Sequence, residues 1–362
     1  SIITNNRELK ANGLTGVSFI NTLNKFERLY SSILEEPEFS NYISQVIEER
    51  VGRPNYYSLT AAYFKNYACK LHLSKDSQIC FFGDIHGAIH SLSRSILRLI
   101  FLGYLGKDLA CAPNFYIIFL GDLVDRSVYS IETIYLIMEL KIKNPNNIFI
   151  IKGNHEDCCL STRYKLDQEF KKLDVNEHQE IYNKYCHTWL HLPVAIFLKI
   201  GDKPYIQLCH GGLYRNADVI KDFLDSDKMA IVFTKHTSDF QWSSFTGVAR
   251  SPYENPNIYG VGEDLKKYYL EETIRYLNYT GIRFVLRGHD DMSHNTKVNV
   301  VGQEDFIKIE AVASKELLRS DDGISSFKIP ILNSAVEASD YVNTYTFTPI
   351  VTLTTGIPSR FV

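Results

Sequence analysis

Five short apolar runs, each followed at once by a glycine-containing turn with Asp, His or Asn, constrain this chain most strongly. The runs are rich in β-branched and aromatic residues, which predicts buried strands. The turns read GDIHG (83–87), GDLVDRS (121–127), GNHE (153–156), HGG (210–212) and RGH (287–289). An open α/β scaffold places its binding and catalytic groups at the carboxyl ends of its strands. The sequence therefore predicts an α/β fold with one site built from five strand ends.

The polar residues of these turns are of the kinds that bind divalent metal ions. They supply carboxylate, imidazole and amide groups, and they are Asp84, His86, Asp122, Asn154, His210 and His289. This mixture suits two hard or borderline divalent ions such as Mn, Fe or Zn. Because a carboxylate can bridge two ions and Asp122 is central among the motifs, we expect Asp122 to be the bridge. Two ions about 3.5–4 Å apart lower the pKa of a shared water and hold both ends of an in-line displacement.

With these motifs the chain resembles the phosphoprotein phosphatases, two-metal enzymes of the calcineurin-like metallophosphoesterase superfamily. Residues 119–157 follow the family's central segment almost throughout, and CHGGL (209–213), Trp242-Ser243 and VLRGHD (285–290) follow it as well. The resemblance covers roughly residues 56 to 290 and resumes near 350. It implies a calcineurin-like metallophosphoesterase fold of the α/β class, in which two sheets form a β-sandwich flanked by helices.

The resemblance also implies a role for each matching ligand. The first metal would be bound by Asp84 and His86, and the second by Asn154, His210 and His289, with Asp122 bridging the two. Manganese is the metal that we expect, with iron or zinc as alternatives.

Catalytic and phosphate-binding roles are implied for the neighbouring residues. His155 would protonate the leaving alkoxide as general acid, Asp125 would orient His155, and Arg126 offers a planar fork for two phosphate oxygens. The family normally supplies a second arginine between the Trp-Ser and the RGH, but residues 244–262 lack the usual Arg-Gly step. Arg250 is the nearest candidate and fits only with a gap, and a solvated loop residue is an equal alternative. Arg215 fits less well.

The implied function is hydrolysis of phosphoserine or phosphothreonine in proteins, by direct attack of a metal-bridging hydroxide and without a phosphoenzyme. A phosphotyrosine or dual-specificity phosphatase on the same scaffold is an alternative. Dinucleoside polyphosphate hydrolysis is disfavoured because the GNHE motif and residues 119–157 follow the protein phosphatases. A pseudoenzyme that binds phosphoproteins without turnover is the alternative of another class, and the complete ligand set argues against it.

We divide the chain into an N-terminal helical extension (1–55) and a catalytic domain (56–362). Helical periodicity in residues 18–51 predicts helices that pack on the catalytic core, with a partner-binding role as the alternative. A further helix is expected over 58–71. An insert at about 291–345 contains strand-like pieces at 298–301 and 306–312, which suggests either a β meander extending one sheet or a lid and partner platform. A targeting partner could therefore bind the N-terminal helices or the insert.

Composition limits the other possibilities. The net charge of −3 gives no signature of nucleic-acid binding, and no apolar run reaches the roughly 18 residues of a membrane span. The seven cysteines lack a CxxC pair, so we expect reduced thiols in the cytoplasm, with a Cys158–Cys159 redox pair as the alternative.

Abundant Ile and Asn with sparse Ala and Pro suggest an AT-rich genome. This composition raises the hypothesis of a secreted bacterial effector of the Wip type that acts in the host cell cytoplasm.

Overall fold

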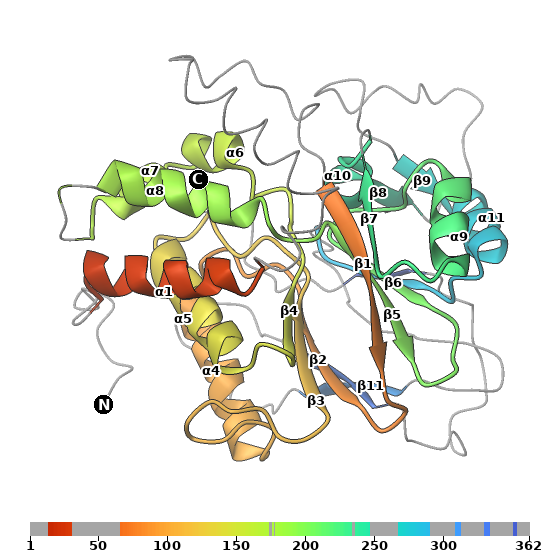
Figure 1. Ribbon diagram of the computed structural model, residues 1–362, viewed down its shortest axis with the longest axis horizontal. Helices are drawn as coiled ribbons and strands as arrows, with labels where there is room; N and C mark the ends of the chain where they lie inside the picture. Colours follow the sequence, from red (N-terminus) through yellow and green to blue (C-terminus); the bar gives the residue numbers. More distant parts are fainter. Residues whose placement is uncertain are drawn as a thin grey trace.

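The structure is a computed structural model of the 362-residue chain. It describes residues 14–30, 66–173, 176, 178–233, 236–246, 267–289, 308–312, 329–333 and 350–352. Within these ranges, two sheets lie face to face and helices cover their outer faces (Figure 1). The expected α/β sandwich flanked by helices is confirmed.

The first sheet is mixed. Its strands are β1 (Asn66–Leu73), β5 (Ala195–Ile200), β6 (Ile206–Cys209), β7 (Ala230–Phe233), β10 (Val285–Arg287) and β13 (Ile350–Thr352). They are arranged in the order β13-β10-β6-β5-β1-β7. Strand β10 is parallel to both β6 and β13, so β6 and β10 end at the same edge of the sheet.

The second sheet contains the first three motif strands. Its strands are β2 (Gln78–Phe82), β3 (Phe115–Phe119), β4 (Ile148–Ile150), β11 (Lys308–Val312) and β12 (Ile329–Asn333), arranged in the order β11-β12-β2-β3-β4. Strands β2, β3 and β4 are parallel. Their carboxyl ends therefore lie together, as the motif pattern requires. A short parallel ribbon of β8 (Ser244–Thr246) and β9 (Lys267–Tyr269) lies outside both sheets.

Side chains along the strands of the second sheet alternate between its two faces. In β2, Ile79 and Phe81 pack in the cluster between the sheets, whereas Cys80 and Phe82 belong to the cluster under the helices. Successive side chains of a strand point to opposite faces. The first sheet supplies Ile196, Leu198 and Leu208, among others, to the cluster between the sheets. This wholly apolar interior holds the two sets of strand ends in fixed relative positions.

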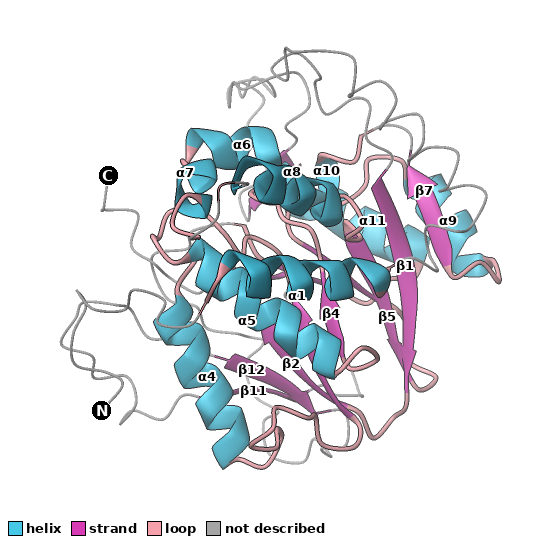
Figure 2. Cartoon of the chain, turned by 60° about the vertical axis from the view of Figure 1, so that its left-hand side comes forward, coloured by secondary structure: helices cyan, strands magenta, loops and turns pink. Residues whose placement is uncertain are grey.

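Helices cover both outer faces. The second sheet is covered by α1 (Gly16–Arg28), α4 (Ile89–Phe101), α5 (Ser130–Lys143), α7 (Leu166–Phe170) and α8 (His178–Trp189), and Figure 2 shows α1 crossing in front of α5. The first sheet is covered by α9 (Ala217–Asp225), α10 (Asp239–Trp242) and α11 (Leu270–Thr280), and α6 (Cys158–Arg163) follows the GNHE turn. Phe19, Leu23 and Phe26 of α1 are fully buried in the shared core. Helix α1 thus packs on the catalytic core, as expected; residues 31–65 lie outside the described ranges.

The helix expected over 58–71 is wrong where the structure describes that segment. Residues 66–73 form β1, which pairs in parallel with β5 and antiparallel with β7. Tyr67 and Ala68 are buried between these neighbours. Pairing on both sides satisfies the backbone groups of the segment, and this tertiary context outweighs a local helical pattern.

The insert contributes two strands to the second sheet. Residues 308–312 of the expected strand piece form β11, which pairs antiparallel with β12, and β12 pairs antiparallel with β2. For these ten residues the pairing agrees with a β meander that extends one sheet. The strand expected at 298–301 lies outside the described residues. None of the helices in the described ranges has the length and apolar character that crossing a membrane requires.

Candidate active site

The structure brings the six ligand-type side chains to one place at the strand ends. Asp84 and His86 follow β2, Asp122 follows β3, Asn154 follows β4, His210 follows β6 and His289 follows β10. Asp122 lies at the centre of this group. Its Oδ2 is 3.0 Å from His210 Nε2 and 3.6 Å from His86 Nε2, and its Oδ1 accepts a hydrogen bond from the His155 backbone at 2.9 Å. The side chain of Asp122 is almost completely buried.

The second half of the site is organised around Asn154. Its Oδ1 lies 2.9 Å from His210 Nε2 and 3.0 Å from His289 Nδ1. Asp84 is fixed beside this group because its Oδ1 accepts the backbone N–H of His289 at 3.0 Å. A Cβ on Gly153 would come within 2.3 Å of Asp122 Oδ1, so only glycine allows the two turns to approach this closely.

Backbone carbonyl groups fix the tautomers of two histidines. His86 Nδ1 donates to the Val124 carbonyl and His210 Nδ1 donates to the Leu120 carbonyl, both at 2.9 Å. In His86, and in His210 once it loses its proton, the Nε2 atom therefore carries the lone pair that faces Asp122. His86 Nε2 is buried and has no hydrogen-bond partner among the described residues. Backbone carbonyls that accept the other ring N–H in this way orient histidine ligands of metals.

The pKa values of the buried histidines and carboxylates reflect the electrostatics of this centre. Burial lowers the pKa of His86 to about 3 and keeps its ring neutral. Burial alone would also lower the pKa of His210, but the Asp122 and Asp84 carboxylates raise it to about 9. Burial raises the pKa of Asp84 to about 6 despite the nearby His210. The imidazole lone pairs and the carboxylates therefore converge on one centre, where they would stabilise a positive charge. The residues thus fit one or more divalent cations, which would replace the His210 proton.

His155 and Asp125 form a buried pair beside this centre. His155 Nδ1 is 2.8 Å from Asp125 Oδ2, and His155 Nε2 is 4.0 Å from Asp122 Oδ2. Ser161 Oγ lies 3.1 Å from Asp125 Oδ2 and 2.6 Å from the His155 carbonyl oxygen, so its single proton is shared between these two acceptors. Burial raises the pKa of Asp125, whereas the hydrogen bond from His155 opposes that rise. The carboxylate holds Nδ1, and Nε2 is directed toward the candidate metal centre.

The predicted arginines differ in position. Arg126 follows Asp125 on the same turn and is exposed. Arg250 lies outside the described residues. Arg215 is held by Asp239, with Nη2 to Oδ1 at 2.7 Å and Nε to Oδ2 at 2.9 Å. This bidentate pair engages two nitrogens of the Arg215 guanidinium group.

Glu156 is an important residue that sequence reasoning missed. Its Oε2 accepts the backbone N–H groups of Asp122 at 2.7 Å and Gly153 at 2.8 Å, and its Oε1 accepts that of Leu123 at 2.8 Å. Burial raises the pKa of Glu156 to about 7, and these N–H donors oppose that rise. Its carboxylate joins the GDLVDRS turn to the GNHE turn. The sequence signal that could have indicated this role is an acidic residue directly after His155, in a turn that contains glycine.

Glu156→Gln is expected to lower the free energy of unfolding by about 2–4 kcal/mol, because an amide offers one oxygen and turns its NH₂ group toward backbone donors. Urea unfolding of both proteins measures the difference. Glu180→Gln, an exposed change on α8, is the matched control. An unchanged midpoint in Glu156→Gln would show that the carboxylate contributes nothing to stability.

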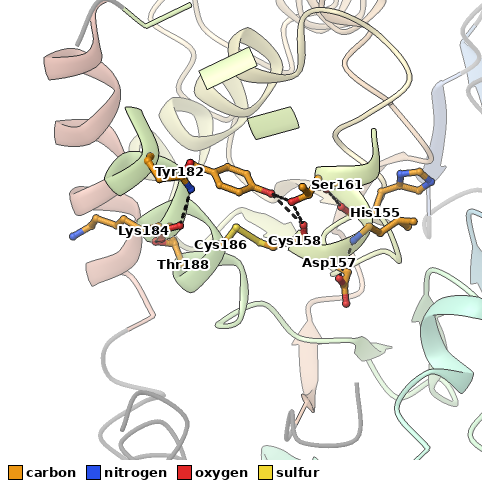
Figure 3. The surroundings of a disulfide bond; sticks show 12 residues. His155, Asp157, Cys158, Ser161, Tyr182, Lys184, Cys186 and Thr188 are labelled. Atoms are coloured by element: carbon orange, nitrogen blue, oxygen red, sulfur yellow. Dashed lines mark hydrogen bonds between the residues drawn. A yellow bond between two sulfur atoms is a disulfide. The ribbon is translucent and has the colours of Figure 1, made fainter. Parts of the chain in front are cut away.

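A disulfide joins Cys158 at the start of α6 to Cys186 in α8 (Figure 3). The prediction of reduced cysteines is therefore wrong for this pair, and so is the pairing of Cys158 with Cys159. The inference of a reducing compartment from the cysteines does not hold for these two. Sequence could not reveal the bond, since the residues are 28 positions apart and meet only through helix packing. The bond anchors α6, which carries Ser161 and its contacts to His155 and Asp125.

Denatured but unreduced protein is expected to take up two fewer alkyl groups than reduced protein, measured by mass spectrometry. Cys186→Ser should lower the free energy of unfolding by about 2–4 kcal/mol, the usual contribution of a disulfide. Cys111→Ser removes a free thiol and serves as the control. Equal alkylation before and after reduction would contradict the bond.

Comparisons with known proteins agree with this geometry. Residues 77–291, more than half of the chain, match the family model of calcineurin-like phosphoesterases. The serine/threonine-protein phosphatase PP2A-like PPG1 of Candida albicans is 35% identical over 144 residues, which are 39% of this chain and 30% of that protein. The match thus spans less than a third of that relative's length.

One solved structure shows the same fold. A protein serine/threonine phosphatase from Saccharomyces cerevisiae, with similarity to human phosphatase PP5, has a TM-score of 0.52 at 21% identity, over 78% of this chain and 73% of that one. A cold-active protein-tyrosine phosphatase of a Shewanella species has a TM-score of 0.39 at 16% identity, over 60% and 67%. That weaker likeness says nothing about the substrate. By the family match and its strand-end site, the chain belongs to the calcineurin-like phosphoesterase family.

Proposed function

We propose that this protein is a metal-dependent protein phosphatase that hydrolyses phosphoserine and phosphothreonine. The observation that supports this most is that five ligand-type side chains gather around a sixth, Asp122, with the His155–Asp125 pair beside them. The similarity to PP2A-like PPG1 of Candida albicans supports the choice of substrate class.

The metal-holding residues divide into two sets around Asp122. Asp84 and His86 would hold one ion, and Asn154, His210 and His289 would hold the other, with Asp122 shared. Two divalent ions bound there supply Lewis acidity toward the phosphoryl group and lower the pKa of water. We propose manganese, with iron or zinc as alternatives that elemental analysis of the purified protein distinguishes.

The remaining residues orient the substrate and move a proton. Asp125 accepts the Nδ1–H of His155, which leaves Nε2 to donate a proton to the leaving alkoxide. Ser161 holds the carboxylate of Asp125 in place for that contact. Arg126, exposed on the same turn, would bind phosphate oxygens in a bidentate manner. Arg250 remains our proposal for a second phosphate ligand.

Phosphate release from three peptides of one sequence, bearing phosphoserine, phosphothreonine or phosphotyrosine, tests the proposal with Mn²⁺ present. We expect turnover of the first two to exceed that of the third. Faster turnover of phosphotyrosine would reassign the substrate class. Tight binding of all three peptides without turnover would identify a phosphoprotein-binding pseudoenzyme, and preferred cleavage of diadenosine tetraphosphate would identify a dinucleotide hydrolase.

The proposed partner is a phosphoprotein substrate. A targeting partner that binds the N-terminal helices or the 291–345 insert stays a prediction. Action in the cytoplasm, or in a host cell cytoplasm as a secreted effector, also stays a prediction from the sequence.

A further inference from the structure

We propose a further divalent metal site, suited to Zn²⁺, that is formed by Glu27, His187 and His191 where α1 packs against α8. The three residues offer one carboxylate and two imidazoles whose ligand atoms all lie within 4.8 Å of one another. None of them belongs to the turns that form the active site. Helix α1 supplies the glutamate, and the end of α8 with the turn after it supplies both histidines.

The measured spacing suits a tetrahedral ion. His187 Nδ1 and Glu27 Oε1 are 3.2 Å apart. Two ligands bound tetrahedrally at about 2.0 Å are separated by roughly 3.3 Å, so a small movement brings both atoms into coordination. The ring centroids of the two histidines are 4.9 Å apart. Water would complete the coordination.

His191 is the observation that points to a ligand. Its side chain is 3% exposed, and neither ring nitrogen has a hydrogen-bond partner among the described residues. Buried polar atoms are normally paired, so an imidazole with two unpaired nitrogens requires an explanation. Burial lowers the pKa of His191 to about 4, which keeps the ring neutral and its lone pair available at physiological pH. A metal ion beside Glu27 and His187 would satisfy one of these nitrogens.

The carboxylate of Glu27 is also suited to bind the ion. Without an ion, the Nδ1–H of His187 donates to Glu27, and this hydrogen bond lowers the pKa of Glu27 to about 2. A bound ion would displace that proton. Lys184 Nζ lies 3.2 Å from Oε2, which leaves Oε1 as the oxygen facing His187. One carboxylate and two imidazoles form a common zinc ligand set. His187 and Glu27 are partly exposed, so an ion can enter from solvent.

A metal at this place would fasten the N-terminal helix to the catalytic domain. Phe26 of α1 already packs on Trp189 of α8, with ring centroids 5.7 Å apart. Helix α8 also carries Cys186, whose disulfide reaches α6 beside His155. The ion would therefore add a cross-link between α1 and the helices that support the candidate active site.

Equilibrium dialysis of the full chain against Zn²⁺, followed by elemental analysis, tests the site. Wild-type protein should hold one more zinc per chain than His187→Gln, in which a partly exposed ligand is removed with little risk to folding. His191→Gln should lose the same ion. His178→Gln, on the first turn of α8 and outside the cluster, should bind as wild type does. Equal zinc content in wild type and His187→Gln would overturn the proposal.

Two further measurements separate this site from the active site and from a structural role. In an Asp122→Asn background, adding His187→Gln should still remove one zinc, whatever the active site retains. At zinc concentrations 100-fold above the dissociation constant, the folded-to-unfolded ratio should rise about 100-fold through this site. That increment should be lost in Asp122→Asn/His187→Gln and kept in Asp122→Asn/His178→Gln. If zinc still stabilises the protein to the same extent after His187 is removed, the assignment is overturned as well.

Discussion

Asp122→Asn is expected to lower phosphopeptide turnover by at least roughly 10²–10³-fold and to remove at least one metal ion from the active site. The Asp122 carboxylate faces the Nε2 atoms of His86 and His210 at 3.6 Å and 3.0 Å, so we expect both sets of ligands to share it. An amide of the same shape lacks the negative charge that balances two dications. The loss should therefore appear in metal content as well as in rate.

Elemental analysis and a phosphoserine peptide assay on the same preparation measure both effects. Asp202→Asn, an exposed change in the turn between β5 and β6, controls for the loss of one carboxylate. Because Asp122 Oδ1 also accepts the His155 backbone N–H, the amide must keep that contact through its oxygen. Full metal content with near-normal turnover in Asp122→Asn would refute the shared role.

The sequence predicted the convergence of the site for a physical reason. A buried strand followed by a glycine turn fixes where the next polar side chain emerges, and parallel strands present such turns at one edge. Asp84 and Asp122 follow adjacent parallel strands of one sheet, whereas His210 and His289 follow parallel strands of the other. Only the packing of the two sheets brings these pairs together, and the family resemblance supplied that relation.

Other features depend on contacts between distant segments and were not predictable from local pattern. The strand at 66–73 is determined by its neighbours β5 and β7, which follow it by more than a hundred residues. The role of Glu156 depends on backbone N–H groups of the preceding motif, and no side-chain pattern records them. The pairing of Cys158 with Cys186 depends on how α6 meets α8.

His155→Asn is expected to keep the active-site metals and to lower turnover of a phosphoserine peptide by roughly 10²–10⁴-fold, the usual effect of removing a positioned proton donor. We expect the side chain not to be a metal ligand, because Nδ1 is held by Asp125 and Nε2 lies 4.0 Å from Asp122 Oδ2. Asparagine retains the backbone N–H that Asp122 accepts. The change therefore removes the proton donor and leaves the centre assembled.

The leaving group decides whether the effect is acid catalysis. A serine alkoxide needs a proton as the P–O bond breaks, whereas nitrophenolate is a stable anion and needs none. The rate loss in His155→Asn should therefore be much smaller for p-nitrophenyl phosphate than for the phosphoserine peptide. Asp125→Asn should show the same selectivity in weaker form, because it disturbs the orientation of His155 and leaves the ring in place. His72→Asn, an exposed change in β1, should alter neither substrate. An equal loss for both esters at unchanged metal content would mean that His155 positions the phosphate and does not protonate the leaving oxygen.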